Sequence, residues 1–137
     1  MPYAEAPTKS MKLRIRDNKI RLRLSRSEVD ALRSEGLLRA SIPFPEGARF
    51  GCTLESSPAS VVPTAHFEND VVLIRLPEAA VREWADSDQV GIAGEQAVEG
   101  EGVLSILVEK DFACLSPRED EDETDMFPHP EAGERRC

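Results

Sequence analysis

The stretch KLRIRDNKIRLRL, residues 12–24, decides how the first part of this chain folds. Apolar and basic residues alternate on both sides of Asp17 and Asn18, and period-two alternation over this length is typical of half-buried strands. Asp and Asn tolerate the positive φ angles of a two-residue hairpin turn. The stretch therefore predicts a hairpin with strands over residues 11–16 and 19–24.

The same pattern returns 52 positions further on, as TAHFENDVVLIRL over residues 64–76. Each copy continues into a short helix and two more strands. Ser25 and Glu28 predict a capping box at the start of the first helix, and Gly36 predicts its end. Pro77 is expected at the first position of the second helix. Self-similarity at a fixed period therefore predicts two ββαββ units.

We expect an α+β, strand-rich fold in which the tandem duplicated ββαββ units form one pseudo-symmetric, barrel-like domain with two short helices. The expected domain spans residues 11–116, with repeats at about 11–56 and 61–112. A flexible N-terminal extension is expected over 1–10, and an acidic C-terminal tail, too poor in apolar residues to build a core, over 117–137. The expected strands are 11–16, 19–24, 38–44, 49–55, 61–67, 71–76, 90–93 and 103–109.

The core is expected to form from the inward positions of the strands and from the apolar stripes of the two helices, with Cys52 as a small core residue. Trp84 is expected to pack there against Val81. The expected core residues are Leu13, Ile15, Ile20, Leu22, Leu24, Val29, Leu32, Phe67, Val72, Ile74, Leu76, Val81, Trp84, Ile92, Leu104, Ile106 and Val108.

The 137 residues carry a formal net charge of −9, which argues against generic binding to nucleic acid or acidic membranes. The charge is uneven, since residues 1–60 carry a net +4 and residues 61–137 a net −13. Three cysteines without a secretory leader do not resemble a disulfide framework. We expect a soluble cytoplasmic protein without a membrane segment.

The register of the first hairpin makes it the most prominent candidate site. With the turn at residues 17–18, cations face one another across the strands, and alternation places all of them on one face. Like charges directly opposite one another destabilise a sheet, so something anionic should offset them. The equivalent positions of the second copy are not basic. The cations expected to contact nucleic acid or another anion are Lys12, Arg14, Arg16, Lys19, Arg21 and Arg23.

Three interpretations of this face stay open. It could be a solvated face that prevents edge-to-edge aggregation. It could bind the chain's own acidic residues 119–125 in an intramolecular contact, with Phe127 anchoring the tail in a groove of the domain. It could also meet the phosphates of DNA or RNA, as a β-ribbon reader does.

Residues 69–90 carry a motif that resembles swapped-hairpin regulators of the AbrB/MazE type. The motif is Arg75-Leu76-Pro77, followed by a short helix and by Asp88-Gln89-Val90-Gly91-Ile92. The resemblance implies two such units in tandem, folded as an internal dimer, so a monomer is expected. The segments MKLRIR, IRLRLS, ADSDQVGI and VEKDFACL also resemble a small bacterial family of unknown function, which implies no activity.

A metal site or an enzyme has weaker support in the sequence. Cys114, His129 and Cys137, together with Asp111, supply ligand types that suit zinc or iron, but their spacing fits no zinc signature. An ordinary buried Cys114 and a free terminal cysteine explain the same residues. Neither histidine, His66 or His129, comes with an orienting residue or an oxyanion hole.

We therefore expect no enzyme and no cofactor. The expected function is a binding or regulatory module that meets nucleic acid through the basic first hairpin. One alternative is a protein-interaction or structural module that docks through its acidic tail, and a second is a metal-binding protein.

Overall fold

The structure, a computed structural model, describes residues 11–112 and 125–128. In chain order, the elements of this described part are β1 (Lys12–Arg16), β2 (Lys19–Leu24), α1 (Arg26–Glu35), β3 (Leu37–Pro43), the 3₁₀ turn η2 (Pro45–Gly47), β4 (Arg49–Ser57), β5 (Thr64–Glu68), β6 (Val71–Pro77), α2 (Glu78–Ala85), β7 (Gly91–Val98) and β8 (Gly102–Lys110).

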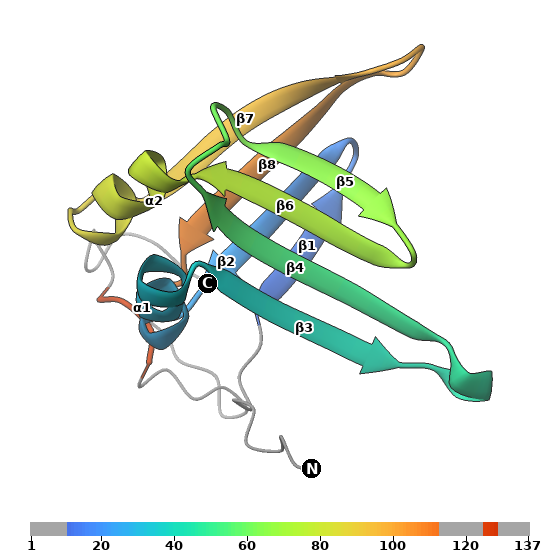
Figure 1. The fold of residues 1–137 in the computed structure, drawn as a ribbon, viewed down its shortest axis with the longest axis horizontal. Coiled ribbons are helices and arrows are strands. Elements are labelled where there is room, and N and C mark those ends of the chain that lie inside the picture. The colour runs from blue at the N-terminus through green and yellow to red at the C-terminus, as the bar shows by residue number, and fades with distance from the viewer. Residues whose placement is uncertain (1–10, 113–124, 129–137) are drawn as a thin grey trace.

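The strands form two four-stranded sheets that exchange hairpins between the two halves of the chain. Sheet A has the order β1-β2-β8-β7, and sheet B has the order β3-β4-β6-β5. Each sheet contains one antiparallel hairpin from each half of the chain. The two hairpins are joined by a parallel pair of central strands. Figure 1 shows sheet B in front of sheet A, with both helices at one end. The strand-rich α+β class is confirmed. The expected barrel-like arrangement is not confirmed, because neither sheet closes.

The two sheets have matching registers. Leu22 faces Val108 in sheet A, and Ile74 faces Leu54 in sheet B, at positions 52 and 54 residues away respectively. The outer hairpins match in the same way, since Leu13 pairs with Leu22 and Ala65 pairs with Ile74. The hairpins of sheet A therefore have counterparts in sheet B, with β1 and β2 matching β5 and β6 and with β7 and β8 matching β3 and β4.

The first helix begins as expected, and the second does not. The Ser25 amide donates to Glu28 Oε1 at 2.8 Å, and the Glu28 amide donates to Ser25 Oγ at 3.4 Å, which completes the capping box. Gly36 ends α1 with a left-handed φ of 79°. Pro77 is the N-cap of α2 rather than its first residue, because it pairs with Ser57 as the last residue of β6 and stays extended.

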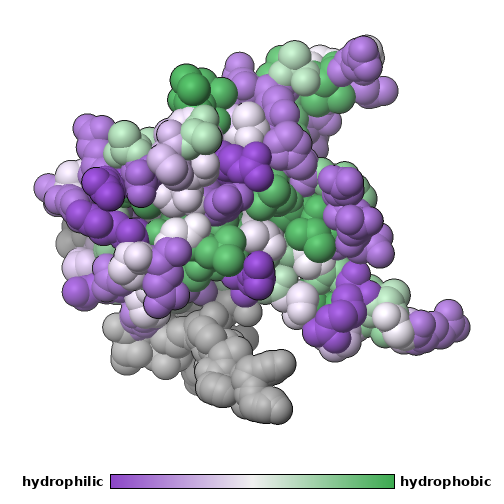
Figure 2. Space-filling model, in the orientation of Figure 1, coloured by the Kyte–Doolittle hydropathy of each residue, from purple (hydrophilic) through white to green (hydrophobic). Residues whose placement is uncertain are grey.

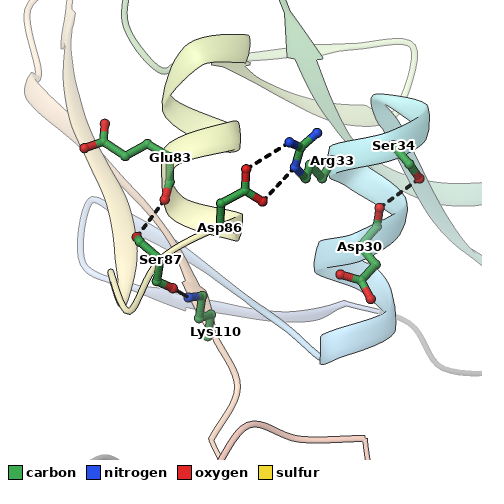
Figure 3. A network of polar contacts seen from close by, with 7 residues as sticks. All are labelled: Asp30, Arg33, Ser34, Glu83, Asp86, Ser87 and Lys110. Atoms are coloured by element: carbon green, nitrogen blue, oxygen red, sulfur yellow. Dashed lines mark hydrogen bonds and ion pairs between the residues drawn. The ribbon is translucent and has the colours of Figure 1, made fainter.

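Polar contacts join the two helices to each other and to sheet A (Figure 3). Arg33 donates two hydrogen bonds to the Asp86 carboxylate, at 2.8 and 2.9 Å. Lys110 Nζ, at the end of β8, donates to the Ser87 carbonyl at 2.7 Å. Burial lowers the pKa of Lys110. These contacts hold the helical end of the molecule against the last strand.

The core lies between the sheets and under the helices, and it includes the expected Trp84, whose indole donates to the Val90 carbonyl at 2.9 Å. The prediction that Ile15 and Phe67 belong to the core is wrong, because Ile15 is 67% exposed and Phe67 is 68% exposed. Both lie near the free ends of edge strands, where no layer covers them. The buried apolar residues are Leu22, Leu24, Val29, Leu32, Cys52, Leu54, Ile74, Leu76, Val81, Trp84, Ile92, Ile106 and Val108.

Two strand boundaries also differ from expectation. β7 runs to Val98 instead of ending at residue 93, because its pairing with β8 continues to the turn before Gly102. The strand expected from residue 61 begins at Thr64, and Val61 and Val62 before it are exposed.

Candidate functional site

The candidate site is the outward face of the β1–β2 hairpin, called here the basic face. The observed pairs are Lys12 with Arg23, Arg14 with Arg21, and Arg16 with Lys19, as the sequence predicted. Because side chains alternate along a strand, these positions share one face. The hairpin therefore carries three rows of opposed cations.

The half of this face near the helices is neutralised by carboxylates at the end of β8. Glu109 Oε2 lies 2.9 Å from Arg21 Nε and 3.0 Å from Arg23 Nε. Asp111 Oδ2 lies 3.0 Å from Lys12 Nζ, and Asp111 is buried. One carboxylate therefore serves two arginines, and a second serves the lysine.

Arg21 is held by charge more than by a directed hydrogen bond. Its Nε is within ion-pair distance of Glu109, but only the Arg23 Nε donates to that oxygen with hydrogen-bond geometry. The Arg21 Nε is buried and has no hydrogen-bond acceptor within the described residues. Arg21 therefore keeps unused donor capacity at the centre of the basic face.

The half near the turn is different. Arg14, Arg16 and Lys19 are exposed, and within residues 11–112 and 125–128 none of them has an ion pair or a side-chain hydrogen bond. We call these three residues the unpaired cations. Like charges opposed across a hairpin cost stability, so this arrangement lacks the compensation that the other half has.

The turn that carries the unpaired cations is held in place by the neighbouring hairpin. Asp17 takes a left-handed φ of 51°. The Ser105 amide donates to the Asn18 carbonyl at 2.9 Å, and Asn18 Nδ2 lies 3.4 Å from the carbonyl oxygens of Glu101 and Val103. The cations at the tip are thus presented on a supported turn.

The counterpart face of sheet B is not basic, as the sequence predicted. Arg75 pairs with Glu55 at 3.1 Å, which matches the pair of Arg23 with Glu109. The other positions are mixed, and His66 is exposed. The face contains a shallow depression of about 490 Å³. It is lined by Leu37, Arg39, Thr53, Glu55, His66, Glu68, Asn69, Val71 and Leu73. Figure 2 shows apolar patches separated by hydrophilic residues on the side facing the viewer.

The described end of the acidic tail lies on the first helix. Asp125 accepts hydrogen bonds from the Ser27 amide at 3.2 Å and from Ser27 Oγ at 2.5 Å. Its carbonyl accepts from the Arg26 amide at 2.9 Å. A carboxylate is stabilised by the free amides and the dipole of a helix N-terminus. Residues 119–124, the rest of the acidic stretch expected to meet the basic face, lie outside the described residues.

Phe127 anchors this segment, as the sequence suggested. Its ring is partly buried against the core, and its centroid lies 5.8 Å from that of Phe112 in an edge-to-face arrangement. Lys110 Nζ lies 5.3 Å from the ring centroid, and the Phe127 amide donates to the Asp111 carbonyl at 2.9 Å. Residues 125–128 therefore lie at the end of sheet A, next to the buried Asp111.

Burial raises the pKa of Glu28, beneath this anchor. The charges of Asp125 and Asp111 act in the same direction, while the hydrogen bonds with Ser25 oppose them.

Within the described residues, no group of His, Cys, Asp and Glu has the arrangement of a metal site. The candidate ligands Cys114, His129 and Cys137 lie outside those residues, and Asp111 pairs with Lys12.

Sequence reasoning missed Glu109 and Asp111 as counter-ions of the basic face. A signal for Glu109 was present, because both members of its pair are repeated. Arg23 recurs as Arg75, and Glu55 recurs as Glu109. Nothing comparable marks Asp111, which reaches Lys12 only because β8 ends beside the start of the first hairpin.

The fold and this site define a strand-rich α+β protein with a cationic hairpin face. The chain belongs to a family of unknown function (DUF7009), whose model matches residues 11–131. No curated protein and no solved structure matches the chain, so the resemblance to AbrB/MazE-type units is not shown by these comparisons. No helix in the described part of the chain is long and apolar enough to cross a membrane.

Proposed function

We propose that this protein is a non-enzymatic binding module that contacts the phosphate backbone of nucleic acid through Arg14, Arg16 and Lys19. One observation carries the proposal. Carboxylates neutralise the helical half of the basic face, and the half at the turn keeps three exposed cations that have no partner in the described part of the chain.

The chemistry of these residues suits phosphate. Arginine stays protonated at neutral pH and presents several N–H donors, which favours ionic contacts with phosphate over proton transfer. A two-stranded ribbon can enter the major groove of DNA or lie along a backbone. Phosphate contacts of this kind position a protein without reading sequence. Because the net charge is −9, binding would depend on this local face and not on long-range attraction.

We further infer that the two halves of the chain arose by tandem duplication and are related in architecture to swapped-hairpin regulators. The matching registers support this, as does the matched pair of arginine and glutamate in each sheet. Each sheet takes one hairpin from either half, as a swapped-hairpin dimer would. The internal partner is then already present, so light scattering should give a monomer mass of 15.2 kDa. A stable dimer mass would contradict this inference.

We also propose that the protein acts in the cytoplasm. Cys52 is a free, buried thiol, which fits a reducing compartment.

The test of binding is fluorescence anisotropy with a labelled DNA duplex and a labelled single-stranded RNA at low salt. The double variant Arg14→Glu/Lys19→Glu should bind both probes at least about tenfold more weakly, because lost phosphate contacts remove the ionic term. The control is Arg49→Glu/Arg82→Glu, which changes the net charge equally at exposed positions away from the basic face.

The two variants separate local contact from overall charge. A large loss confined to Arg14→Glu/Lys19→Glu would support the proposal. Equal losses in both double variants would mean that net charge alone decides the interaction. No binding of either probe by the unaltered chain would refute the nucleic-acid proposal.

A further inference from the structure

The two sheets face each other across two seams, and the matched registers make these seams equivalent. One seam lies between β5 and β7, the other between β1 and β3 (Figure 1). The β5–β7 seam is closed. Gly94 lies so close to Pro63 that a Cβ on the glycine would be 2.8 Å from the proline ring. The Ala65 amide donates across this seam to Gln96 Oε1 at 2.8 Å.

The β1–β3 seam is open, although its residues occupy the same positions. The counterparts of Pro63, Ala65, Gly94 and Gln96 are apolar here, and a hollow of about 110 Å³ separates the strands. Ile42, which replaces the glutamine, is 54% exposed. The four counterpart residues are Met11, Leu13, Ala40 and Ile42, and the rest of the lining is Leu22, Ser41, Phe50 and Cys52.

The floor of the hollow is mostly apolar and carries no charged side chain. Burial raises the pKa of Cys52 to about 11, so its thiol is neutral at physiological pH. Apolar cavities of about 150 Å³ are known to stay dry and to take up a small apolar molecule. A hollow of 110 Å³ therefore fits one aliphatic side chain.

The backbone at this seam offers a strand-pairing edge. β1 is the outer strand of sheet A, and β3 is the outer strand of sheet B. Leu13 occupies the register position of Ala65, whose amide points out of its sheet to the glutamine. The side chain of Ile42, the counterpart of Gln96, has no hydrogen-bond acceptor for the Leu13 amide. An added extended segment could take up this edge, as in β-augmentation.

The charges at the two seams are opposite. Arg14, Arg16 and Arg39 lie on β1 and β3, and these two strands contain no carboxylate; Lys12, also on β1, pairs with Asp111. β5 and β7 contain two glutamates and neither lysine nor arginine. A segment that pairs at the β1–β3 seam would thus be drawn there by negative charge.

We propose that the β1–β3 seam docks an extended acidic peptide segment of a partner protein, with one of its aliphatic side chains in the hollow. This goes beyond the proposed contact with nucleic acid. It adds the side of β1 that faces β3, the apolar floor and a backbone edge, while the cations of β1 take part in both contacts.

The test uses the full chain and a fluorescein-labelled peptide in which glutamate and valine alternate. Wild-type protein should bind this probe and not a probe with lysine in place of glutamate. Ala40→Phe fills the hollow, and Ile42→Glu adds a negative charge at an exposed position. Each should weaken binding at least tenfold. The control is Val98→Glu, on β7 of the closed seam, where the residue is 37% exposed and affinity should not change.

Chemical shifts of the backbone amides supply the second readout. The Leu13 and Ile42 signals should move on addition of the acidic probe, and those of Ala65 and Gln96 should not. No binding of the acidic probe, equal binding of the lysine probe, or unchanged affinity in Ile42→Glu would overturn the proposal. DNA binding measured on Ala40→Phe separates the two proposals, because this variant keeps every cation of the basic face.

Discussion

Replacing Glu109 by glutamine should destabilise the protein more than the same change at Glu55. The two residues occupy matching positions, each beside an arginine of the neighbouring parallel strand. Glu109 Oε2 contacts Arg21 and Arg23, at 2.9 and 3.0 Å, whereas Glu55 Oε1 contacts Arg75 alone, at 3.1 Å. The comparison isolates the number of cations that one carboxylate serves.

The expected magnitudes follow from burial. The Glu55 side chain is 34% exposed and that of Arg75 is 38% exposed, so losing this pair should cost about 0.5 kcal/mol. The Glu109 side chain is only 13% exposed. Removing its charge leaves Arg21 and Arg23 facing other cations without a counter-ion. We therefore expect the free energy of unfolding to fall by about 2 kcal/mol, less than the roughly 3–5 kcal/mol lost when a fully buried ion pair is broken. Glutamine is close in shape, so packing contributes little to the difference.

Urea denaturation of the two variants at neutral pH measures the difference. At low salt we expect a gap of about 1.5 kcal/mol, and in about 1 M NaCl a smaller one, because the Debye length falls to about 3 Å. Equal losses in both variants would refute the reasoning that Glu109 compensates the basic face. So would a gap that salt leaves unchanged.

Three further predictions concern single groups. Burial raises the pKa of Glu28, so ionising this carboxyl lowers the free energy of unfolding. The loss is absent at low pH and grows as pH rises above the ordinary pKa of about 4.3. Glu28→Gln keeps the capping box and should therefore be more stable than the parent at pH 7 but not near pH 4; urea titrations showing no such pH dependence would contradict this. Asp125→Ala should cost about 1 kcal/mol and speed hydrogen exchange at the Ser27 amide, as loss of a helix cap does; unchanged exchange would show that the cap is dispensable. In a variant whose only cysteine is Cys52, the thiol should react with a maleimide far more slowly in the folded than in the unfolded protein at pH 7, because its pKa is about 11; equal rates would argue against burial.

Local pattern was enough to predict the first hairpin and its counterpart. Two turn residues between alternating segments leave one register, and the observed pairs of Arg14 with Arg21 and of His66 with Leu73 are those the sequence predicts. The α1 capping box was equally local. These features were predictable because each depends on residues at most eleven positions apart.

Features that depend on distant strands were not predictable. β2 pairs with β8 across most of the chain, and no local period encodes that partnership. Ile15 and Phe67 lie on the inward side of the alternation, but alternation cannot show where the opposing layer ends. The neutralised half of the basic face was missed for the same reason, since Glu109 reaches Arg23 only after the parallel pair has formed.

The most direct test of the account is the salt dependence of DNA binding by wild-type protein and by Arg14→Gln. Contact by the three unpaired cations predicts that log K falls with log salt at a slope of about −2.7, and loss of one contact should reduce this to about −1.8. A slope that is the same in both proteins would contradict the claim that Arg14 and its neighbours on the basic face meet phosphates.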